Sequence, residues 1–252
     1  MTADEHRWQI FLEVHSGLPR EGPGNRASTA RALRLAGAMP PNPLVVDVGC
    51  GPGAQTLDLA ELIPDARIAA FDRHAPYIAE LRRRAGAAGC ARRIDAQTGD
   101  MRALPLAERG VDLLWCEGAA YFLGIPEALR VWKPLLKPGG RIALTEPAWL
   151  MPDPPPAARA NWREYPAMTD VAGNRAIIAR AGFTLLGDFT LPSAAWMDDY
   201  YRPLEARARS LEARYADDAI AQQVLREAAA EVDAYRRYSA YFGYQFFVMA
   251  AD

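Results

Sequence analysis

A glycine-rich turn between Val46 and Ala54 is the segment whose residue types and spacing point most directly to chemistry. It follows the Val-rich run Leu44–Val48 and precedes a segment with helical apolar spacing. Glycine lets a backbone approach a ligand without interference from a Cβ atom, and the helix N-terminus beyond it supplies unpaired N–H groups. We therefore expect a ligand at this turn, at the carboxyl end of a parallel strand.

Two patterns overlap in the turn and favour different ligands. Gly49, Gly51 and Ala54 match G-x-G-x-x-G/A, which is typical of dinucleotide-binding proteins. The same segment also reads D-x-G-x-G-x-G, from Asp47 to Gly53. A tight strand–helix connection that binds nothing is the third interpretation of such a turn.

Asp72 adds a second candidate group to the turn. It ends the next expected strand, about 20 residues after Gly51, where an acidic residue can accept hydrogen bonds from both ribose hydroxyls. NAD and S-adenosylmethionine both contain an adenosine ribose, so Asp72 does not separate them. It does make the interpretation without a ligand less favourable.

The elements that must position these residues alternate between short strands and helices of about ten residues, which predicts an α/β fold with a doubly wound, parallel, seven-stranded sheet. We expect strands at Leu44–Val48, Ala66–Phe71, Arg92–Thr98, Val111–Cys116, Arg141–Thr145, Phe183–Leu191 and Gln245–Ala250. We expect helices at Trp8–Val14, Ser28–Leu35, Ala54–Ile63, Pro76–Ala85, Pro126–Leu136 and Val171–Ala181, a turn at Pro138–Gly140 and a loop at Pro152–Pro156. A helical insertion before the last strand is expected at about 192–240.

Composition excludes several classes of protein. The 252 residues are 50% hydrophobic and have a net charge of −2, so a basic nucleic-acid-binding surface is not expected. No apolar run is long enough to span a membrane, and the charged N-terminal segment does not resemble a signal peptide. Three widely spaced cysteines predict no disulfide framework, and the three histidines have no metal-ligand spacing. We expect a cytoplasmic protein without a metal site.

Five motifs in order resemble the class I S-adenosylmethionine-dependent methyltransferases: VVDVGCGPG, AFDRHA, TGDMRALPL, VDLLWCEGAAYFL and LLKPGGRIALTEP. The resemblance covers about residues 40–190. The whole chain resembles a bacterial small-molecule subgroup to which no substrate is assigned. The resemblance implies a Rossmann-like methyltransferase fold and S-adenosyl-L-methionine as the cofactor.

The resemblance also implies a set of cofactor-binding residues. Asp72 would hold the ribose hydroxyls, Asp100 would accept a hydrogen bond from the adenine amine, and the glycines would surround the methionine part. The full set comprises Asp47, Gly49, Cys50, Gly51, Gly53, Asp72, Arg73, Asp100, Met101, Glu117 and Gly118.

Candidates for the acceptor side follow the ends of the fourth and fifth strands and enter the insertion. Methyl transfer needs mainly proximity and alignment, and a base only where the acceptor must lose a proton. Glu117, Tyr121 and Glu146 are the catalytic candidates, with His15 as a further possible base. Tyr121, Trp149 and Trp196 are the candidates for binding the acceptor. Each also has a structural interpretation, as a capping carboxylate, a core aromatic residue or a surface histidine.

The organisation expected from these patterns is an N-terminal lead-in at 1–43 and a methyltransferase domain at 44–252 with the helical cap. The Gly- and Pro-rich loop Arg20–Asn25 and the cap would form a lid over the site, although the apolar stripe of the cap would equally suit a dimer. The expected function is methyl transfer to a small molecule by a monomer or homodimer. The alternatives are an NAD-dependent oxidoreductase and a non-catalytic S-adenosylmethionine-binding protein.

Overall fold

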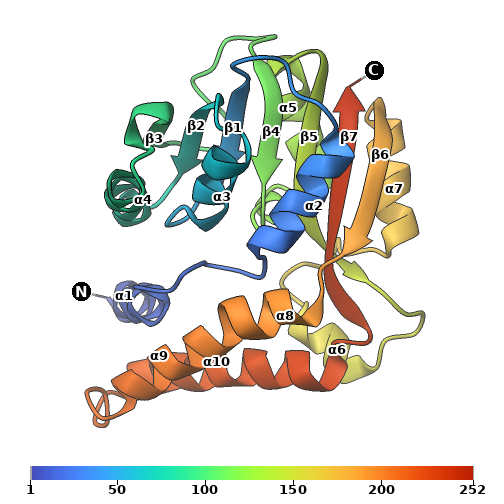
Figure 1. The fold of residues 1–252 in the computed structure, drawn as a ribbon. Coiled ribbons are helices and arrows are strands. Elements are labelled where there is room, and N and C mark those ends of the chain that lie inside the picture. Colours follow the sequence, from blue (N-terminus) through green and yellow to red (C-terminus); the bar gives the residue numbers. More distant parts are fainter. Residues whose placement is uncertain (1, 252) are drawn as a thin grey trace.

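Seven strands form one sheet in the order β3-β2-β1-β4-β5-β7-β6 in the computed structural model, which describes residues 2–251 (Figure 1). The strands are β1 (Leu44–Val48), β2 (Arg67–Asp72), β3 (Ile94–Thr98), β4 (Val111–Cys116), β5 (Leu136–Trp149), β6 (Phe183–Thr190) and β7 (Phe242–Ala251). The predicted seven-stranded α/β sheet is therefore confirmed. The first and last residues of the two expected domains, 1 and 252, lie outside the described part.

Helices cover both faces of this sheet. On one face lie α2 (Arg26–Ala36), α3 (Ala54–Leu62) and α4 (Ala75–Ala87), and on the other lie α5 (Ile125–Trp132) and α7 (Val171–Arg180). The Asn25 side chain caps α2 by accepting a hydrogen bond from the Ser28 N–H, and Asp170 caps α7 in the same way. The strands β1 and β4 are buried on both faces, as their Val- and Leu-rich sequences predict.

A cap lies at the edge of the sheet where β1–β5 end and β7 begins, below the sheet in Figure 1. It consists of α1 (Ala3–His15), the short α6 (Pro156–Asn161) and α8 (Ser193–Trp196), a π-helical turn (Met197–Tyr201), α9 (Arg202–Glu212) and α10 (Ala219–Tyr238). The predicted helical insertion before the last strand is thus present. Its apolar stripe on α10 is buried, and α1 packs against both α9 and α10.

Several local predictions were wrong. The sheet is mixed, because the insertion returns the chain to the edge where β5 and β6 end, so that β7 runs antiparallel to both. The expected turn at Pro138–Gly140 belongs to β5, which starts at Leu136 and pairs irregularly with β4. The helix expected to reach Leu136 ends at Trp132 and continues as a 3₁₀ turn. The Pro-rich loop ends one residue early, since Pro156 begins α6, a position that proline tolerates. The third strand starts at Ile94, after a 3₁₀ turn.

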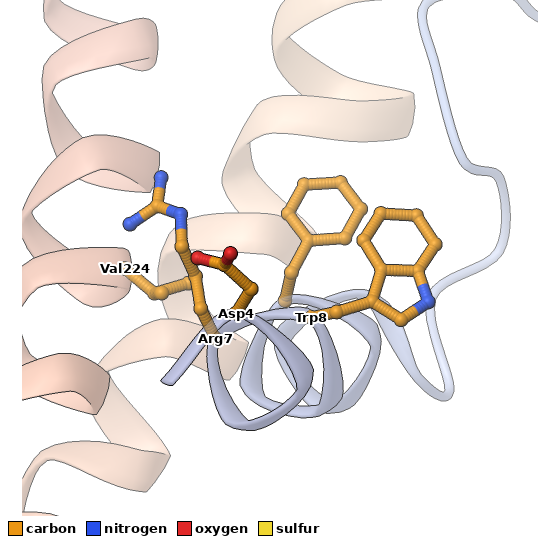
Figure 2. Close-up of a pocket in the computed structure, with 5 residues that line it drawn as sticks. Asp4, Arg7, Trp8 and Val224 are labelled. Carbon is orange, nitrogen blue, oxygen red and sulfur yellow. The ribbon is translucent and has the colours of Figure 1, made fainter. Parts of the chain in front are cut away.

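Trp196 should contribute much more to stability than Trp8. The Trp196 ring is 2% exposed and stacks on Tyr235 at 4.5 Å. Trp8 lies on the outer side of α1, beside a shallow pocket shared with Val224 of α10 (Figure 2), and is 57% exposed. In urea unfolding, Trp196→Ala should cost roughly 3–5 kcal/mol, whereas Trp8→Ala should change stability by less than about 0.5 kcal/mol. Equal losses would contradict this placement of the two rings.

Candidate cofactor and acceptor site

The glycine turn folds back onto the end of β2. The backbone N–H groups of Gly49 and Cys50 both donate to the Phe71 carbonyl, at 2.8 and 3.0 Å. Gly49, Gly51 and Gly53 have φ values of 70°, 53° and 92°, in the left-handed region that favours glycine. The turn therefore requires glycine for its own conformation as well as for any approach of a ligand.

Asp72 joins the turn to the start of α4. Its Oδ2 accepts a hydrogen bond from the Gly51 N–H at 2.9 Å, and its Oδ1 accepts one from the His74 N–H at 2.8 Å. The side chain is half-buried, so lone pairs of both oxygens remain available to a ligand at the sheet edge. The predicted proximity of Asp72 to the glycine turn is thus present in the fold.

Asp47 supports the turn from within. It is fully buried, and its carboxylate accepts hydrogen bonds from the Thr56 hydroxyl at 2.5 Å and from the Gln55 amide at 3.4 Å. Burial raises the pKa of Asp47 to about 7, and the hydrogen bond from Thr56 opposes that rise. Cys50 beside it is buried too, and burial likewise raises the pKa of its thiol. Both side chains serve the packing of the turn.

The remaining predicted cofactor residues are more open. Arg73 and Asp100 are exposed, and Asp100 accepts a hydrogen bond from the Arg102 N–H at 2.9 Å. Met101 is half-buried; its carbonyl accepts from the Trp132 indole at 2.9 Å, and its methyl group lies 4.0 Å from the position of a Cβ on Gly49. Arg73 follows the end of β2, and Asp100 and Met101 follow the end of β3.

Glu117 is tied into a buried network that the sequence did not reveal. Its Oε1 accepts hydrogen bonds from the Trp115 indole at 2.8 Å and the Thr29 hydroxyl at 3.0 Å, and its Oε2 forms an ion pair with Arg20. With three donors on one carboxylate, Glu117 is occupied by structural partners, and the geometry does not favour it as a proton acceptor. Of these three donors, only Trp115 could be inferred from the sequence as a neighbour of Glu117, because it lies two residues earlier and so points to the same side of the sheet.

The loop from Arg20 to Asn25 lies over the glycine turn. The Cγ of Glu21 is 3.3 Å from the position of a Cβ on Gly51, and the Glu21 carboxylate accepts a hydrogen bond from the Tyr77 hydroxyl at 2.8 Å. Burial raises the pKa of Glu21 to about 7, the hydrogen bond from Tyr77 lowers it, and the nearby charge of Asp72 raises it further. The Gly24 N–H donates to the carbonyl of Ala195 in the cap at 3.1 Å.

Glu146 is the acidic candidate with an unsatisfied oxygen. It is 1% exposed, and its Oε1 accepts a hydrogen bond from the Tyr165 hydroxyl at 2.5 Å, whereas its Oε2 has no hydrogen-bond partner among residues 2–251. Burial raises the pKa of Glu146 to about 8. Tyr121 lies beside it, with its ring 5.8 Å from that of Tyr165. Two of the predicted catalytic candidates, Tyr121 and Glu146, are thus brought together through a third residue.

The other acceptor candidates, Trp149 and Trp196, make different contacts. Trp149 is half-buried, with the Arg159 guanidinium 5.7 Å from its ring centre. Trp196 packs inside the cap, edge-on to Tyr244 at 4.9 Å. For His15, given as a possible base, the alternative of a surface histidine is wrong: the side chain is buried, with its Nε2 3.5 Å from the Tyr200 hydroxyl in the π-helical turn, and burial lowers its pKa.

Comparison with known proteins agrees with this geometry. Residues 45–140 match the family model of the methyltransferase domain. A trans-aconitate 2-methyltransferase of Azoarcus sp. (strain BH72) is 31% identical over 192 residues, which cover 74% of this chain and 65% of that protein. Residues 45–140 of this chain therefore belong to the methyltransferase domain family.

Two solved structures share the fold of the methyltransferase domain and its cap over nearly their whole length. Both are described as S-adenosylmethionine-dependent methyltransferases in complex with S-adenosyl-L-homocysteine. The one from Geobacter sulfurreducens has a TM-score of 0.82 at 22% identity and covers 97% of this chain and 98% of that chain. The one from Thiobacillus denitrificans has a TM-score of 0.83 at 21% identity, with the same coverage. The curated relatives match over a smaller part: this chain spans between 40% and 65% of the length of the first three.

Among residues 2–251, no helix is long and apolar enough to cross a membrane. Within the same part of the chain, no group of three or more His, Cys, Asp or Glu side chains is arranged to hold a metal ion.

Glu146→Gln should gain stability relative to the wild type as the pH rises. The folded chain raises the pKa of Glu146 from 4.5 to about 8, so ionisation favours the unfolded state. The protonated carboxyl contributes fully to the free energy of unfolding below pH ~4.5, and this contribution is lost as the pH rises to about 8. Urea unfolding at pH 5 and pH 9 should show the variant gaining roughly 2–5 kcal/mol over the wild type between the two conditions.

The exposed Glu164→Gln provides the matched control, because Glu164 lies only one residue from Tyr165 but faces solvent. Its difference from the wild type should be the same at both pH values. A constant difference for Glu146→Gln as well would show that Glu146 ionises as readily in the folded chain as in the unfolded one.

Proposed function

We propose that this protein transfers a methyl group from S-adenosylmethionine to a small-molecule acceptor. The observation that carries the proposal is the hydrogen bond from the Gly51 N–H to the Asp72 carboxylate. It places an open glycine backbone and a half-buried carboxylate side by side at the carboxyl edge of the sheet, where doubly wound folds bind nucleosides. The family match over residues 45–140 supports the same conclusion.

The chain's residues fit the cofactor. Asp72 would accept hydrogen bonds from the ribose hydroxyls, with Arg73 beside the adenine. Asp100 and Met101, at the end of β3, would meet the adenine edge. Gly49, Cys50, Gly51 and Gly53 would surround the methionine part, with Asp47 holding their turn and Glu117 and Gly118 facing the transferred group. S-Adenosylmethionine, when bound, supplies a methyl group already activated by its sulfonium charge.

The contribution of the protein is then mainly alignment and exclusion of water. Tyr121 follows the end of β4, and Glu146 lies within the last residues of β5, three before its end at Trp149; they are the residues best placed to face an acceptor. Small acceptors are also indicated by the names of curated relatives, which include trans-aconitate 2-methyltransferases. Trp149 and Trp196 would act by packing the walls of the site.

The competing functions have less support. An NAD-dependent oxidoreductase would need a group for hydride transfer, and the sequence contains no Tyr-x-x-x-Lys pair. A non-catalytic S-adenosylmethionine-binding protein would not need the unpartnered oxygen of Glu146. We propose a cytoplasmic monomer or homodimer that does not bind nucleic acid, in keeping with its net charge of −2.

Asp72→Asn tests the cofactor site. The substitution keeps the size of the side chain but removes its charge, and hydrogen bonds to charged groups contribute about 1.5–3 kcal/mol. Calorimetric affinity for S-adenosylhomocysteine should fall about ten- to a hundredfold. Asp95→Asn, on the exposed part of β3, should leave the affinity unchanged. A folded Asp72→Asn protein that binds as tightly as the wild type would place the ribose elsewhere.

We further propose that the loop Arg20–Asn25 and the cap form a lid over the cofactor. Three contacts support this role: Glu21 lies against Gly51, Arg20 pairs with Glu117, and Gly24 donates to Ala195 in the cap. The loop thus touches the turn, the end of β4 and the cap at once. In the proposed division, the lead-in at 1–43 supplies the lid loop and α1, which packs against α9 and α10 of the domain at 44–252.

Gly24→Ala should open this lid. A Cβ on Gly24 would lie 2.4 Å from Arg20 Nη2 and 2.6 Å from Glu117 Oε2, both buried, so the loop must move away. Overpacking of this kind costs about 1–3 kcal/mol, and we expect affinity for S-adenosylhomocysteine to fall about tenfold. Gly22→Ala is the matched control, since nothing lies within 4 Å of its added Cβ. Identical affinities for the two variants would exclude a lid.

A further inference from the structure

The acceptor side of the site contains two carboxylates for which the fold supplies no cation. Glu146, on β5, has one oxygen bonded to Tyr165 and one without a partner. Glu231, on α10, accepts a hydrogen bond from the Tyr201 hydroxyl at 3.1 Å. Neither takes part in an ion pair with any residue between 2 and 251. Burial raises the pKa of each, with only a tyrosine hydrogen bond opposing it.

These two carboxylates lie near the same tyrosines. Tyr121 lies beside Tyr165, the partner of Glu146. Tyr201, the partner of Glu231, is linked to Tyr244 by the Trp196 ring, at 5.8 and 4.9 Å between ring centres. Burial raises the pKa of Tyr121 and of Tyr244, and the charges of both carboxylates raise each pKa further. The Tyr244 ring lies 3.6 Å from the position of a Cβ on Gly118, which follows β4 beside the cofactor turn. The cluster thus extends from β5 and the cap to the cofactor side of the sheet edge.

Aromatic rings complete the cluster. Tyr121 faces Tyr165, and Tyr244 lies edge-on to Trp196 and 6.4 Å from Trp162. Carboxylates among aromatic rings attract cations by charge and by the negative faces of the rings. Burying a charged carboxylate without a counter-ion is unfavourable. A cationic ligand would therefore be bound favourably, because it supplies the missing counter-ion.

We infer that the methyl acceptor is a cationic amine, bound between Glu146 and Glu231 against Tyr121 and Tyr244, with Glu146 taking the proton of the ammonium group. The inference rests on the proposed function and names its class of substrate. An anionic acceptor would need a positively charged side chain in the same place, and the two carboxylates would repel it.

The proposed transfer consists of a proton transfer followed by a displacement at the methyl carbon. The Glu146 carboxylate accepts one proton from the ammonium group, which frees the nitrogen lone pair. The nitrogen then forms a bond to the methyl carbon, and the carbon–sulfur bond breaks with its electron pair left on sulfur. The nitrogen regains its positive charge, and Glu231 remains ionised as its counter-ion. A carboxylate whose pKa is raised toward 8 is well suited to this proton transfer.

Three probes of the same shape test the inference by binding alone: choline, its neutral isostere 3,3-dimethylbutan-1-ol, and anionic 3,3-dimethylbutanoate. Their affinities are measured by calorimetry at pH 9, with and without S-adenosylhomocysteine. Wild-type protein should bind choline at least about tenfold more tightly than 3,3-dimethylbutan-1-ol, and should bind the anionic 3,3-dimethylbutanoate most weakly. Glu146→Gln and Glu231→Gln should each reduce this preference about tenfold, and both glutamines can still accept the tyrosine hydrogen bonds.

Glu164→Gln removes the same charge from an exposed position nearby and should leave the preference unchanged. The inference is overturned if 3,3-dimethylbutan-1-ol or 3,3-dimethylbutanoate binds as tightly as choline. It is also overturned if Glu146→Gln and Glu231→Gln both keep the preference for choline. Binding of S-adenosylhomocysteine is recorded in the same experiment. A protein that binds it but does not prefer choline retains the proposed function and loses only this class of acceptor.

Discussion

A charged carboxylate buried at the end of a strand is strongly unfavourable unless it has partners. Glu117, 8% exposed at the end of β4, meets this requirement with Arg20 from the N-terminal loop. The pair draws that loop across the edge of the sheet. Glu21 consequently lies against Gly51, and Gly24 reaches the cap. The position of the N-terminal loop over the glycine turn therefore depends on the position of Glu117 at the end of β4.

The sheet edge divides its acidic groups by environment. Asp72 is held by two backbone N–H groups and is half-open to solvent, so it can remain a hydrogen-bond acceptor for a polar ligand. Asp47 is fully buried beneath the turn, and its oxygens accept hydrogen bonds from Thr56 and Gln55. Glu146 is equally buried but retains an oxygen without a partner. Residues of the same chemical type thus have different roles, set by how many donors the fold brings to each.

The cap brings a second set of side chains to the edge of the sheet. It carries Glu231 on α10 and the aromatic rings of Trp196 and Tyr235 to the edge of the sheet, and α1 closes over it from the other end of the chain. Because β7 begins at Phe242, opposite Trp149 at the end of β5, the insertion must start and finish beside the site. This return of the chain explains why β7 is antiparallel.

The amino-acid sequence by itself determined the order of strands and helices, the glycine turn and its acidic partner Asp72. These signals are local: apolar periodicity, glycines that need a left-handed backbone, and a residue at a strand end. Strand boundaries also depend on pairing with distant residues: β5 starts at Leu136, which pairs with Val111, and Pro138–Gly140 form an irregular segment before pairing resumes at Arg141. The resemblance to methyltransferases added the cofactor and the expected role of each residue in the turn.

Only the tertiary structure decided which side chains meet across the chain. Arg20 and Glu117 are 97 residues apart, and Tyr77 and Glu21 are 56 apart, so no periodicity links them. Nor could spacing separate Tyr121, which lies with Tyr165 and Glu146, from Trp196, which packs within the cap. The physical reason is that burial and pairing depend on long-range packing. Sequence patterns place a residue on one face of an element, whereas packing decides what that face meets.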